Sequence, residues 1–434
     1  MDINKIEKIK VAFYTLGCKV NQYETNLMKE SCINNNYEIV DFNDIADIYI
    51  VNSCSVTNLA TRKTRNILAK CKRKNENCIT VLVGCYAEEL VYSNNQDKVV
   101  CDYIFGNEEK KNIIQLLKEK TRVNVCNIED VDKYVQTDIL KTGVNIRESV
   151  KIEDGCNNFC SYCIIPYLRG RIRSRNINDI LSEVESLTNN GVLEIIIVGI
   201  EIASYGKDLD EDITLIDVIE KINSIKKVKR IRLGSIEPRF LTDENIERLS
   251  KIDKLCNYFH ISVQSLDNNV LSRMNRKYTN DYVLNAITKL RDKFINCAIT
   301  CDLIVGFINE SIPEFNTTVE YIKKIKFSNM NVFKFSKRKY TKAYNMDTTV
   351  TDLDKDNRSK EIIKLGNTLS TEFMSKFLGK KEFVLFEEFK DGYLYGYTTN
   401  YIKVKVKGSN NLWKKVVEVE LISLEKDLIL GILV

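Results

Sequence analysis

The stretch DGCNNFCSYCIIPYLRGRIRSR, residues 154–175, decides how the rest of the chain is interpreted. Cys156, Cys160 and Cys163 are spaced CxxxCxxC within one polar loop, so three thiolates can surround one small inorganic centre. An iron–sulfur cluster normally takes four cysteine ligands, and a structural zinc ion also takes four ligands. The single histidine, His260, lies far away in an apolar run and is a poor fourth ligand. The pattern favours a [4Fe–4S] cluster with one iron left open for a small molecule over three ordinary buried cysteines.

Length and composition set the class of protein. A chain of 434 residues with 29% charged and 44% hydrophobic residues is expected to fold into two or three globular domains. No apolar run approaches the roughly 20 residues of a membrane span, and the polar N-terminus is unlike a signal peptide. We therefore expect a cytoplasmic protein with no membrane partner. The 14 cysteines then favour metal or cluster binding over disulfides, and the net charge of +5 permits a nucleic-acid partner without requiring one.

Residues 1–140 are predicted to form a parallel α/β sheet. Apolar strand-like runs at 8–15, 46–51 and 78–83 are each followed by a helical pattern, at 21–34, at 57–74 and from 87 onwards. Cys18, Cys54 and Cys85 follow these three runs, with Gly17 and Gly84 suited to tight exit turns. Because the carboxyl ends of parallel strands meet at one edge, we expect the three cysteines to converge there. The alternative is that they are free core cysteines, as we expect Cys32, Cys71, Cys78, Cys101 and Cys126 to be.

Residues 141–365 are predicted to form a partial (β/α)6 barrel related to the TIM barrel. Strand-like runs recur at 149–152, 194–198, 229–233, 258–263, 300–305 and 332–335, with helices between them such as 177–190. A capping box at Ser311 begins another helix. In such barrels the chemistry lies at the carboxyl ends of the strands. The cysteine loop follows the first run, and the later runs are followed by Gly199, Glu201, Ser235, Glu237, Gln264 and Gly306.

Residues 366–434 are predicted to form a small antiparallel β-barrel. Five short β-rich runs follow the last helical pattern, at 382–387, 393–398, 402–406, 415–422 and 428–434. Residues 402–407, IKVKVK, alternate strictly, so the valines are expected inside and Lys403, Lys405 and Lys407 on one outer face. Taken alone, these lysines favour a solvated edge strand.

Three basic runs flank the predicted site. They lie at residues 62–74, at Arg169, Arg171, Arg173 and Arg175, and at Lys337, Arg338 and Lys339. Because all three are expected to face one opening, they favour a polyanionic substrate whose phosphates they contact.

The extended string behind the cysteines, IIPYLRGRIRSR (164–175), resembles the methylthiotransferase branch of the radical S-adenosylmethionine (SAM) enzymes. TLGCKVNQYET (15–25), VNSCSVTNLATRKTR (51–65) and GCYAEE (84–89) resemble the three cysteine motifs of the same family, and the tail resembles its RNA-binding TRAM module. Within that family, TLGCKVNQYET and DGCNNFCSYCIIPYLRGR look most similar to the bacterial enzymes that modify N6-threonylcarbamoyladenosine in tRNA.

The resemblance implies two [4Fe–4S] clusters, one on Cys156, Cys160 and Cys163 and an auxiliary one on Cys18, Cys54 and Cys85. The first cleaves SAM to a 5′-deoxyadenosyl radical that activates C2 of adenosine 37; the second delivers sulfur, and a second SAM supplies the methyl group. It also implies that SAM contacts Tyr162, Gly199, Glu201, Ser235, Glu237, Gln264 and Gly306. Implied partners are the tRNA anticodon stem-loop, a sulfur source and an electron donor such as flavodoxin or ferredoxin.

Two stretches depart from the family pattern, Leu233-Gly234-Ser235 and the Gly306-Phe307-Ile308 segment, which lacks a proline. Three alternatives remain. The same chemistry could act on isopentenyladenosine in tRNA or on an aspartate of a ribosomal protein, or the chain could be a non-catalytic iron–sulfur or zinc RNA-binding protein.

Overall fold

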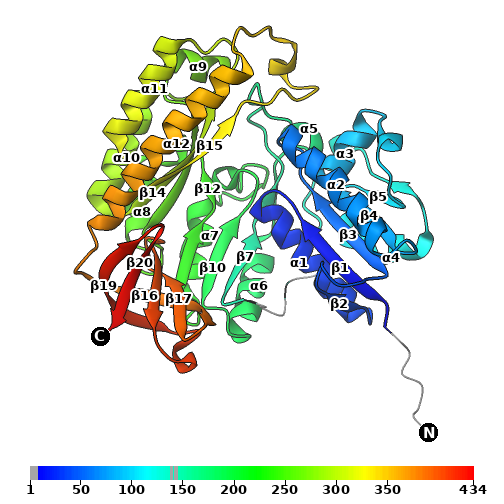
Figure 1. Cartoon of the computed structure of the whole chain (residues 1–434), viewed down its shortest axis with the longest axis horizontal. Helices are drawn as coiled ribbons and strands as arrows, with labels where there is room; N and C mark the ends of the chain where they lie inside the picture. The colour runs from blue at the N-terminus through cyan, green and yellow to red at the C-terminus, as the bar shows by residue number, and fades with distance from the viewer. Residues whose placement is uncertain (1–7, 137–139, 141–144) are drawn as a thin grey trace.

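The computed structural model describes residues 8–136, 140 and 145–434 (Figure 1). Its N-terminal part is a six-stranded sheet in the order β2-β1-β3-β4-β5-β6, and every pair of neighbours runs parallel. The strands are β1 (Lys10–Thr15), β2 (Glu38–Val40), β3 (Ile48–Ser53), β4 (Ile79–Gly84), β5 (Tyr103–Phe105) and β6 (Val123–Asn124). The helices are α1 (Lys19–Asn34), α2 (Asn58–Lys74), α3 (Cys85–Tyr92) and α4 (Ile113–Glu119).

The predicted parallel sheet is thus confirmed, including its three strand–helix units. The central strands β3 and β4 consist almost wholly of buried residues, as expected where helices cover both faces of a parallel sheet. α2 begins at a normal N-cap, since the Thr57 side chain accepts a hydrogen bond from the amide of Ala60.

The middle of the chain is an open parallel barrel. The strands are β7 (Arg147–Lys151), β10 (Glu194–Val198), β11 (Arg230–Leu233), β12 (Ser235–Ile236), β13 (Tyr258–Gln264), β14 (Ala298–Val305) and β15 (Asn329–Lys334). They form two adjoining sheets, β7-β10-β11 and β12-β13-β14-β15. β12 continues β11 after a break at Gly234, so the six predicted strand positions are all occupied. Within the described residues β7 and β15 do not pair with each other, and the barrel stays open between them.

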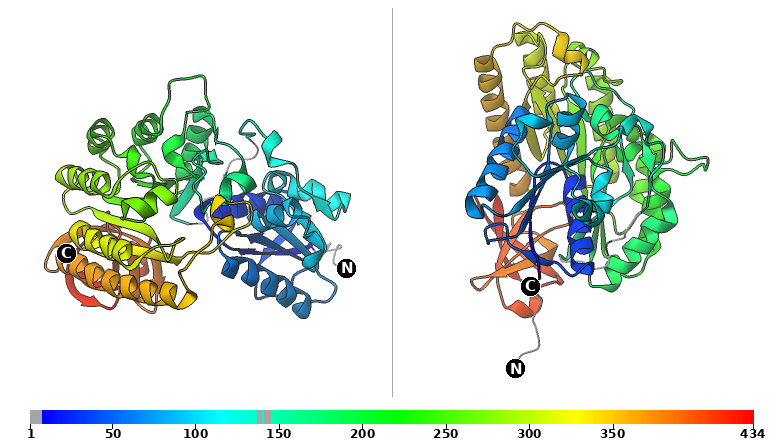
Figure 2. Two further views of the ribbon diagram at one scale, coloured as in Figure 1. Left: turned by 90° about the horizontal axis from the view of Figure 1, so that it is seen from above. Right: turned by 90° about the vertical axis from the view of Figure 1, so that its right-hand side faces the viewer.

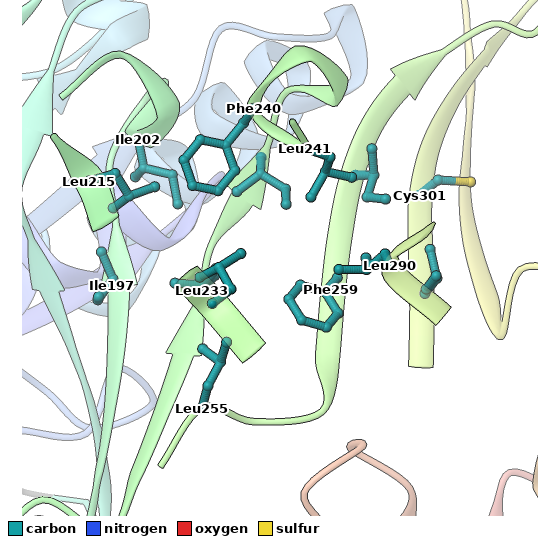
Figure 3. Packing of buried hydrophobic residues seen from close by; sticks show 14 of the residues in the cluster. Ile197, Ile202, Leu215, Leu233, Phe240, Leu241, Leu255, Phe259, Leu290 and Cys301 are labelled. Atoms are coloured by element: carbon teal, nitrogen blue, oxygen red, sulfur yellow. The ribbon is translucent and has the colours of Figure 1, made fainter. Parts of the chain in front are cut away.

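Helices cover the outside of this barrel (Figure 1). They are α6 (Ile177–Asn189), α7 (Leu215–Ser224), α8 (Asp243–Ser250), α9 (Asn268–Arg273), α10 (Asn280–Lys293), α11 (Ile312–Ile325) and α12 (Asp352–Ser375). The capping box at Ser311 is present at the start of α11. Between helices and strands lies the largest apolar core, where for example Leu233, Phe259 and Leu290 pack together (Figure 3). This core makes the barrel a rigid support for the loops at its carboxyl end.

The tail closes into a five-stranded barrel, as predicted. Its strands are β16 (Lys381–Lys390), β17 (Tyr393–Tyr397), β18 (Lys403–Lys407), β19 (Val416–Glu425) and β20 (Leu428–Leu433). Four of the five pairings are antiparallel, and β18 with β20 is parallel. One parallel pair is unavoidable, because an odd number of strands cannot alternate direction all the way round a closed ring. Val404 and Val406 are buried inside, and the lysines of β18 point outward.

The three parts meet along the open barrel (Figures 1 and 2). The N-terminal sheet lies at the side of the barrel, with α1 next to β7. The small barrel lies at the end where the central strands begin: Arg147 pairs with Glu387 at 2.6 Å, and Arg230 donates to the carbonyl oxygens of Tyr397 and Phe383. Within the described residues, no helix is long and apolar enough to cross a bilayer.

Candidate active site

The CxxxCxxC loop runs from β8 (Glu153–Asp154) to α5 (Ile165–Arg169). Its base is closed because β8 pairs with β9 (Arg173–Ser174), and because the amide of Cys156 donates to the carbonyl of Gly170 at 3.1 Å. Gly155 has φ +79°, and a Cβ there would overlap the carbonyl of Arg171. A glycine is therefore required for the chain to turn into the loop.

Neighbouring segments hold the loop and direct hydrogen bonds at its sulfurs. The amide of Asn158 lies 3.5 Å from Sγ of Cys156, and Nη1 of Arg276 lies 3.4 Å from Sγ of Cys160. Ser161 donates to the carbonyl of Arg273 at 2.7 Å, which ties the loop to the end of α9. Donors aimed at cysteine sulfurs are a usual feature of cluster sites, where they stabilise the added negative charge of the reduced state.

Cys18, Cys54 and Cys85 come together at one edge of the N-terminal sheet, as predicted. They follow the neighbouring strands β1, β3 and β4 in turn. Gly17, with φ +101°, brings its backbone so close that a Cβ would lie 2.8 Å from Cβ of Cys54. The five cysteines expected to be ordinary core residues lie elsewhere, with Cys32, Cys71, Cys78 and Cys101 buried and Cys126 half-buried.

Burial changes the chemistry of these thiols. It raises the pKa of Cys54 to about 12 and that of Cys163 to about 12. Without a ligand both would be protonated at neutral pH, yet only a thiolate ligates iron. A bound cationic centre must therefore supply the stabilisation that solvent does not.

Both cysteine sets reach one cavity of about 520 Å³. Cys18 and Cys54 line it from the N-terminal sheet, and Cys163 lines it from the barrel loop. Its remaining walls are mostly apolar and come from both parts: Gly17, Val56, Thr57, Ala60, Tyr162, Ile164, Ile165, Gln264, Asp302, Ile304, Phe333, Lys334, Phe335 and Ser336. In this cavity, groups bound by the two cysteine sets could act on the same substrate.

The donor sets are compatible with four-iron clusters. Over residues 8–136, 140 and 145–434, no three His, Cys, Asp or Glu side chains converge on a point that could hold one metal ion. In a four-iron cube each thiolate ligates a different iron, so its ligands need not converge. Three cysteines per set leave one iron of each cube without a protein ligand, which a small molecule or a sulfur atom can take.

Two of the predicted SAM residues line the cavity, Tyr162 and Gln264. Glu201 lies beside the cluster loop, where it accepts a hydrogen bond from Nδ2 of Asn158 at 3.0 Å. Gly199 lies against Glu153, and a Cβ there would overlap Oε1 of that side chain. Burial, with Glu237 as a second cause, raises the pKa of Glu201 to about 7. In the described part of the chain, Oε2 of Glu153 and Oε1 of Glu201 are buried without a hydrogen-bond partner, which suits a ligand rich in donors such as SAM.

The other three predicted SAM residues lie in different surroundings. Ser235 is exposed, and Glu237 accepts from the amide and Nε of Arg239 at the start of a short 3-10 helix. Gly306 has φ +67° and lies beneath Lys355 of α12. It is not among the described residues that line the cavity.

The sequence analysis missed four residues of the site: Glu153, Asp302, Phe333 and Phe335. Asp302 accepts hydrogen bonds from Nε2 of His260 at 3.1 Å and from Nδ2 of Asn331 at 2.9 Å, so the lone histidine orients a carboxylate of the cavity wall. Alternation could have revealed Asp302, because it shares the inner face of β14 with Ile304. Phe333 and Phe335 carry no such chemical signal, since aromatic residues are common in any strand.

The arginines that follow the CxxxCxxC loop were expected to contact phosphates of a substrate, and for three of them this prediction is wrong. Arg169, Arg173 and Arg175 are at most 1% exposed, so they do not contact phosphates of a substrate. Arg169 pairs with Glu24 and Asp154. Arg173 pairs with Glu108, and Arg175 pairs with Glu183. Arg338 is also buried, paired with Glu89. Desolvation explains the outcome, since a charge inside a protein must be paired. Arg171 and the outer side chains of α2, such as Arg62 and Arg65, remain exposed.

Comparison with known proteins adds the family. Residues 150–322 match the model of the radical SAM superfamily, and residues 10–106 match the model described as uncharacterized protein family UPF0004. The chain is 36% identical to threonylcarbamoyladenosine tRNA methylthiotransferase MtaB of Bacillus subtilis, over 95% of this chain and 93% of that protein. It is 34% identical to tRNA-2-methylthio-N(6)-dimethylallyladenosine synthase of a Thermoanaerobacter species, over 88% of this chain and 83% of that protein.

Among solved structures, the radical SAM methyltransferase TsrM from Kitasatospora setae superposes with a TM-score of 0.56, at 14% identity, over 78% of this chain and 77% of that one. This likeness concerns the fold alone. The sequence relationship goes further, because identity above 30% extends over nearly the whole of both chains. This relationship shows that the chain belongs to the radical SAM methylthiotransferases, a family that uses SAM and two [4Fe–4S] clusters, and cysteines of both sets line one cavity.

Proposed function

We propose that the protein adds a methylthio group to C2 of N6-threonylcarbamoyladenosine at position 37 of tRNA. Cys156, Cys160 and Cys163 hold the cluster that binds SAM, and Cys18, Cys54 and Cys85 hold the auxiliary cluster. The observation that carries the proposal is the single cavity shared by Cys18, Cys54 and Cys163. We infer the exact nucleoside from the name of the B. subtilis relative, which is a threonylcarbamoyladenosine tRNA methylthiotransferase.

When bound, SAM and the two clusters supply the radical, the sulfur and the methyl group. The protein supplies the geometry. Tyr162 and Gln264 line the cavity beside the loop, and Glu153 and Glu201 offer unpaired acceptor oxygens to the cofactor. Gly199 leaves room for Glu153 to reach that position. The apolar walls, with Ile304 and Phe335 among them, exclude water from a reactive intermediate.

We propose that RNA is held by exposed basic groups outside this cavity. On the small barrel, Lys403 and Lys405 lie over the rings of Tyr395 and Tyr393 at 5.9 and 4.6 Å, and Lys407 is exposed. Exposed Arg62, Lys63 and Arg65 lie on α2, which begins next to the cavity wall. Cations and aromatic rings together suit an RNA backbone with unpaired bases, and the anticodon loop offers both.

We retain the division into residues 1–140 for the auxiliary cluster, 141–365 for the radical SAM domain and 366–434 for RNA binding. A sulfur source and an electron donor such as flavodoxin or ferredoxin complete the proposed partners. We also propose a cytoplasmic location, because the proposed substrate is tRNA.

Isopentenyladenosine in tRNA is the second candidate substrate. A relative named for dimethylallyladenosine, which is the same nucleoside, is 34% identical to this chain. Nucleoside mass spectrometry of tRNA from a deletion strain separates the two. Loss of the methylthio form of threonylcarbamoyladenosine supports the proposal, and loss of the isopentenyl form alone contradicts it. Unchanged tRNA would point to a ribosomal protein or a non-catalytic role.

The cluster assignment has its own test. Anaerobically reconstituted protein should contain about eight irons per chain, as two four-iron clusters require. Replacing Cys156, Cys160 and Cys163 by Ala should leave about four irons and abolish SAM cleavage, whereas Cys54→Ala should also leave about four irons but spare SAM cleavage. Cys71→Ala, at a buried cysteine away from the cavity, is the matched control and should retain both clusters. Equal iron loss in the control would refute the assignment.

A further inference from the structure

Arg169 links the two cysteine sets. It is the last residue of α5, six positions after Cys163, and its side chain is fully buried. Its Nε lies 3.4 Å from Sγ of Cys85, on the N-terminal sheet. A residue that follows the CxxxCxxC loop therefore contacts a cysteine of the other set.

The guanidinium is fixed on its other sides. Nη1 donates to Oε1 of Glu24 at 2.8 Å and to Oδ2 of Asp154 at 3.0 Å, and Nη2 donates to Oε2 of Glu24 at 3.0 Å. Nη2 also donates to Oδ1 of Asn21 at 2.7 Å. Glu24 and Asn21 belong to α1, and Asp154 is the last residue of β8, just before the CxxxCxxC loop. All five N–H groups of an arginine form a rigid fork, so these partners set the direction of Nε.

The buried charges around Arg169 do not balance. Lys110 and Lys151 join the same network through Glu24, and Lys151 also pairs with Asp154 at 2.6 Å. Arg173 also reaches Oδ2 of Asp154 at 4.0 Å, so four cations contact these two carboxylates, and Arg173 has a further partner in Glu108. A surplus positive charge in a buried place is costly unless an anion lies beside it. Cys85 is the cysteine whose sulfur receives a hydrogen bond from Arg169.

Cys85 differs from the other two cysteines of its set in the side-chain donors that reach its sulfur. Asn107 adds a second donor, with Nδ2 at 3.9 Å from Sγ of Cys85 and 2.9 Å from the carbonyl of Leu168. Cys54 receives the backbone amide of Val56 at 3.5 Å. In the part of the chain that the structure describes, Arg169 is the charged side chain that donates to a cysteine of this set.

We propose that Arg169 is a positioning residue for the auxiliary centre: it orients the sulfur of Cys85, and its charge favours the reduced, more negative state of the cluster bound there. This inference rests on the proposed function, because it takes Cys18, Cys54 and Cys85 as the cluster ligands. Arg169 also binds Glu24 of the N-terminal part and Asp154 of the barrel. The position of the Cys85 sulfur therefore depends on how the N-terminal sheet packs against the barrel.

The test is a redox titration followed by electron paramagnetic resonance. The full chain is used with Cys156, Cys160 and Cys163 replaced by Ala, so that only the auxiliary cluster contributes. In this background Arg169→Gln removes the charged donor, and Arg169→Lys keeps the charge but loses the fork. The Gln variant should shift the reduced-to-oxidised ratio at fixed potential about tenfold toward the oxidised form, which for one electron is about 59 mV to lower potential. The Lys variant should fall between.

Arg175→Gln is the matched control. Arg175 is equally buried, pairs with Glu183 and contacts Tyr23 of α1, and none of its hydrogen-bond partners among the described residues is a cysteine. The Arg175→Gln variant should lower the unfolding midpoint about as much as Arg169→Gln does. It should leave the reduction potential of the auxiliary cluster unchanged. Should Arg169→Gln fail to load the cluster while Arg175→Gln loads it, with similar unfolding midpoints, the orienting role is supported.

Two results would overturn the inference: an unchanged potential in Arg169→Gln, or the same shift or the same cluster loss in Arg175→Gln. Failure of the proposed function looks different. In that case the background protein with intact Arg169 would show no four-iron signal at all.

Discussion

Arg338 and Glu89, 249 residues apart in the sequence, form a buried ion pair. Arg338 follows β15 at the far edge of the barrel, and Glu89 lies on α3 of the N-terminal sheet. Nη2 of Arg338 also donates to the Ser55 hydroxyl at 2.8 Å, next to Cys54. The barrel edge thereby holds the segment that carries a cysteine of the auxiliary site.

Arg338→Met should therefore loosen the N-terminal sheet against the barrel. Removing one partner of a buried pair leaves the other charge unpaired and costs about 3–5 kcal/mol. We expect faster hydrogen exchange in α3 and in the segment around Ser55. Lys339→Met, at an exposed neighbour, is the control and should not change exchange there. A double change, Arg338→Met with Glu89→Leu, should recover part of the loss, and no recovery would mean that the ion pair is not its source.

Gly199→Ala should weaken SAM binding. A Cβ at this position would overlap Oε1 of Glu153, a buried side chain that also accepts from the amide of Glu201 at 2.5 Å. Glu153 must then move out of the proposed cofactor site. We expect the dissociation constant for SAM, measured by equilibrium dialysis on loaded protein, to rise about tenfold, which corresponds to about 1.4 kcal/mol. Gly366→Ala, on α12, should bind SAM normally, and unchanged binding in Gly199→Ala would argue against this site.

The lysines of β18 should contribute to tRNA affinity through phosphates. Replacing Lys403, Lys405 and Lys407 by Gln should weaken binding and reduce the slope of log affinity against log salt by about two, since each lost phosphate contact removes about 0.7. Filter binding at several salt concentrations measures this slope. The charge-matched control replaces exposed Lys323 and Lys324 on α11 and Lys326 at its C-cap. Equal slopes for the two triple variants would locate the RNA elsewhere.

Glu88 should make stability depend on pH. Burial raises its pKa from 4.5 to about 8 in the folded protein, although the amide of Asn107 donates to it at 2.6 Å. The carboxyl of Glu88 loses its proton near pH 4.5 in the unfolded state and near pH 8 in the folded state. Between these two pH values only the folded state holds the proton, so the free energy of unfolding falls as pH rises.

Urea unfolding of the wild type and of Glu88→Gln at pH 6 and pH 8 measures the effect. The wild type should lose about 2 kcal/mol more than Glu88→Gln between the two pH values. Glu76→Gln, at an exposed carboxylate, should behave as the wild type does. If Glu88→Gln retains the full pH dependence, another group is responsible.

Much of the fold followed from local patterns. β10 occupies the predicted residues 194–198, α6 ends within a residue of its predicted end, and the alternation at 402–407 placed the valines inside and the lysines outside. Such signals are local because the period of a strand or helix is set by its own backbone geometry.

The cysteines were predictable for a related reason. A cysteine at the end of a strand keeps its place whatever the helices do, so strand order alone brings Cys18, Cys54 and Cys85 to one edge. Basic residues behaved differently. The sequence shows charge but not burial, and Arg169, Arg173 and Arg338 are buried only because carboxylates from distant segments come to meet them.

The sequence by itself determined the two cysteine triplets, the parallel sheets that carry them and the alternating strand of the small barrel. Only the tertiary structure decided that cysteines of both sets line one cavity, and that the buried side chain of Arg169 donates to Cys85 and does not face a substrate. The physical reason is that ligand spacing and strand period are properties of neighbouring residues, whereas the pairing of a buried charge depends on which surfaces the folded chain brings together.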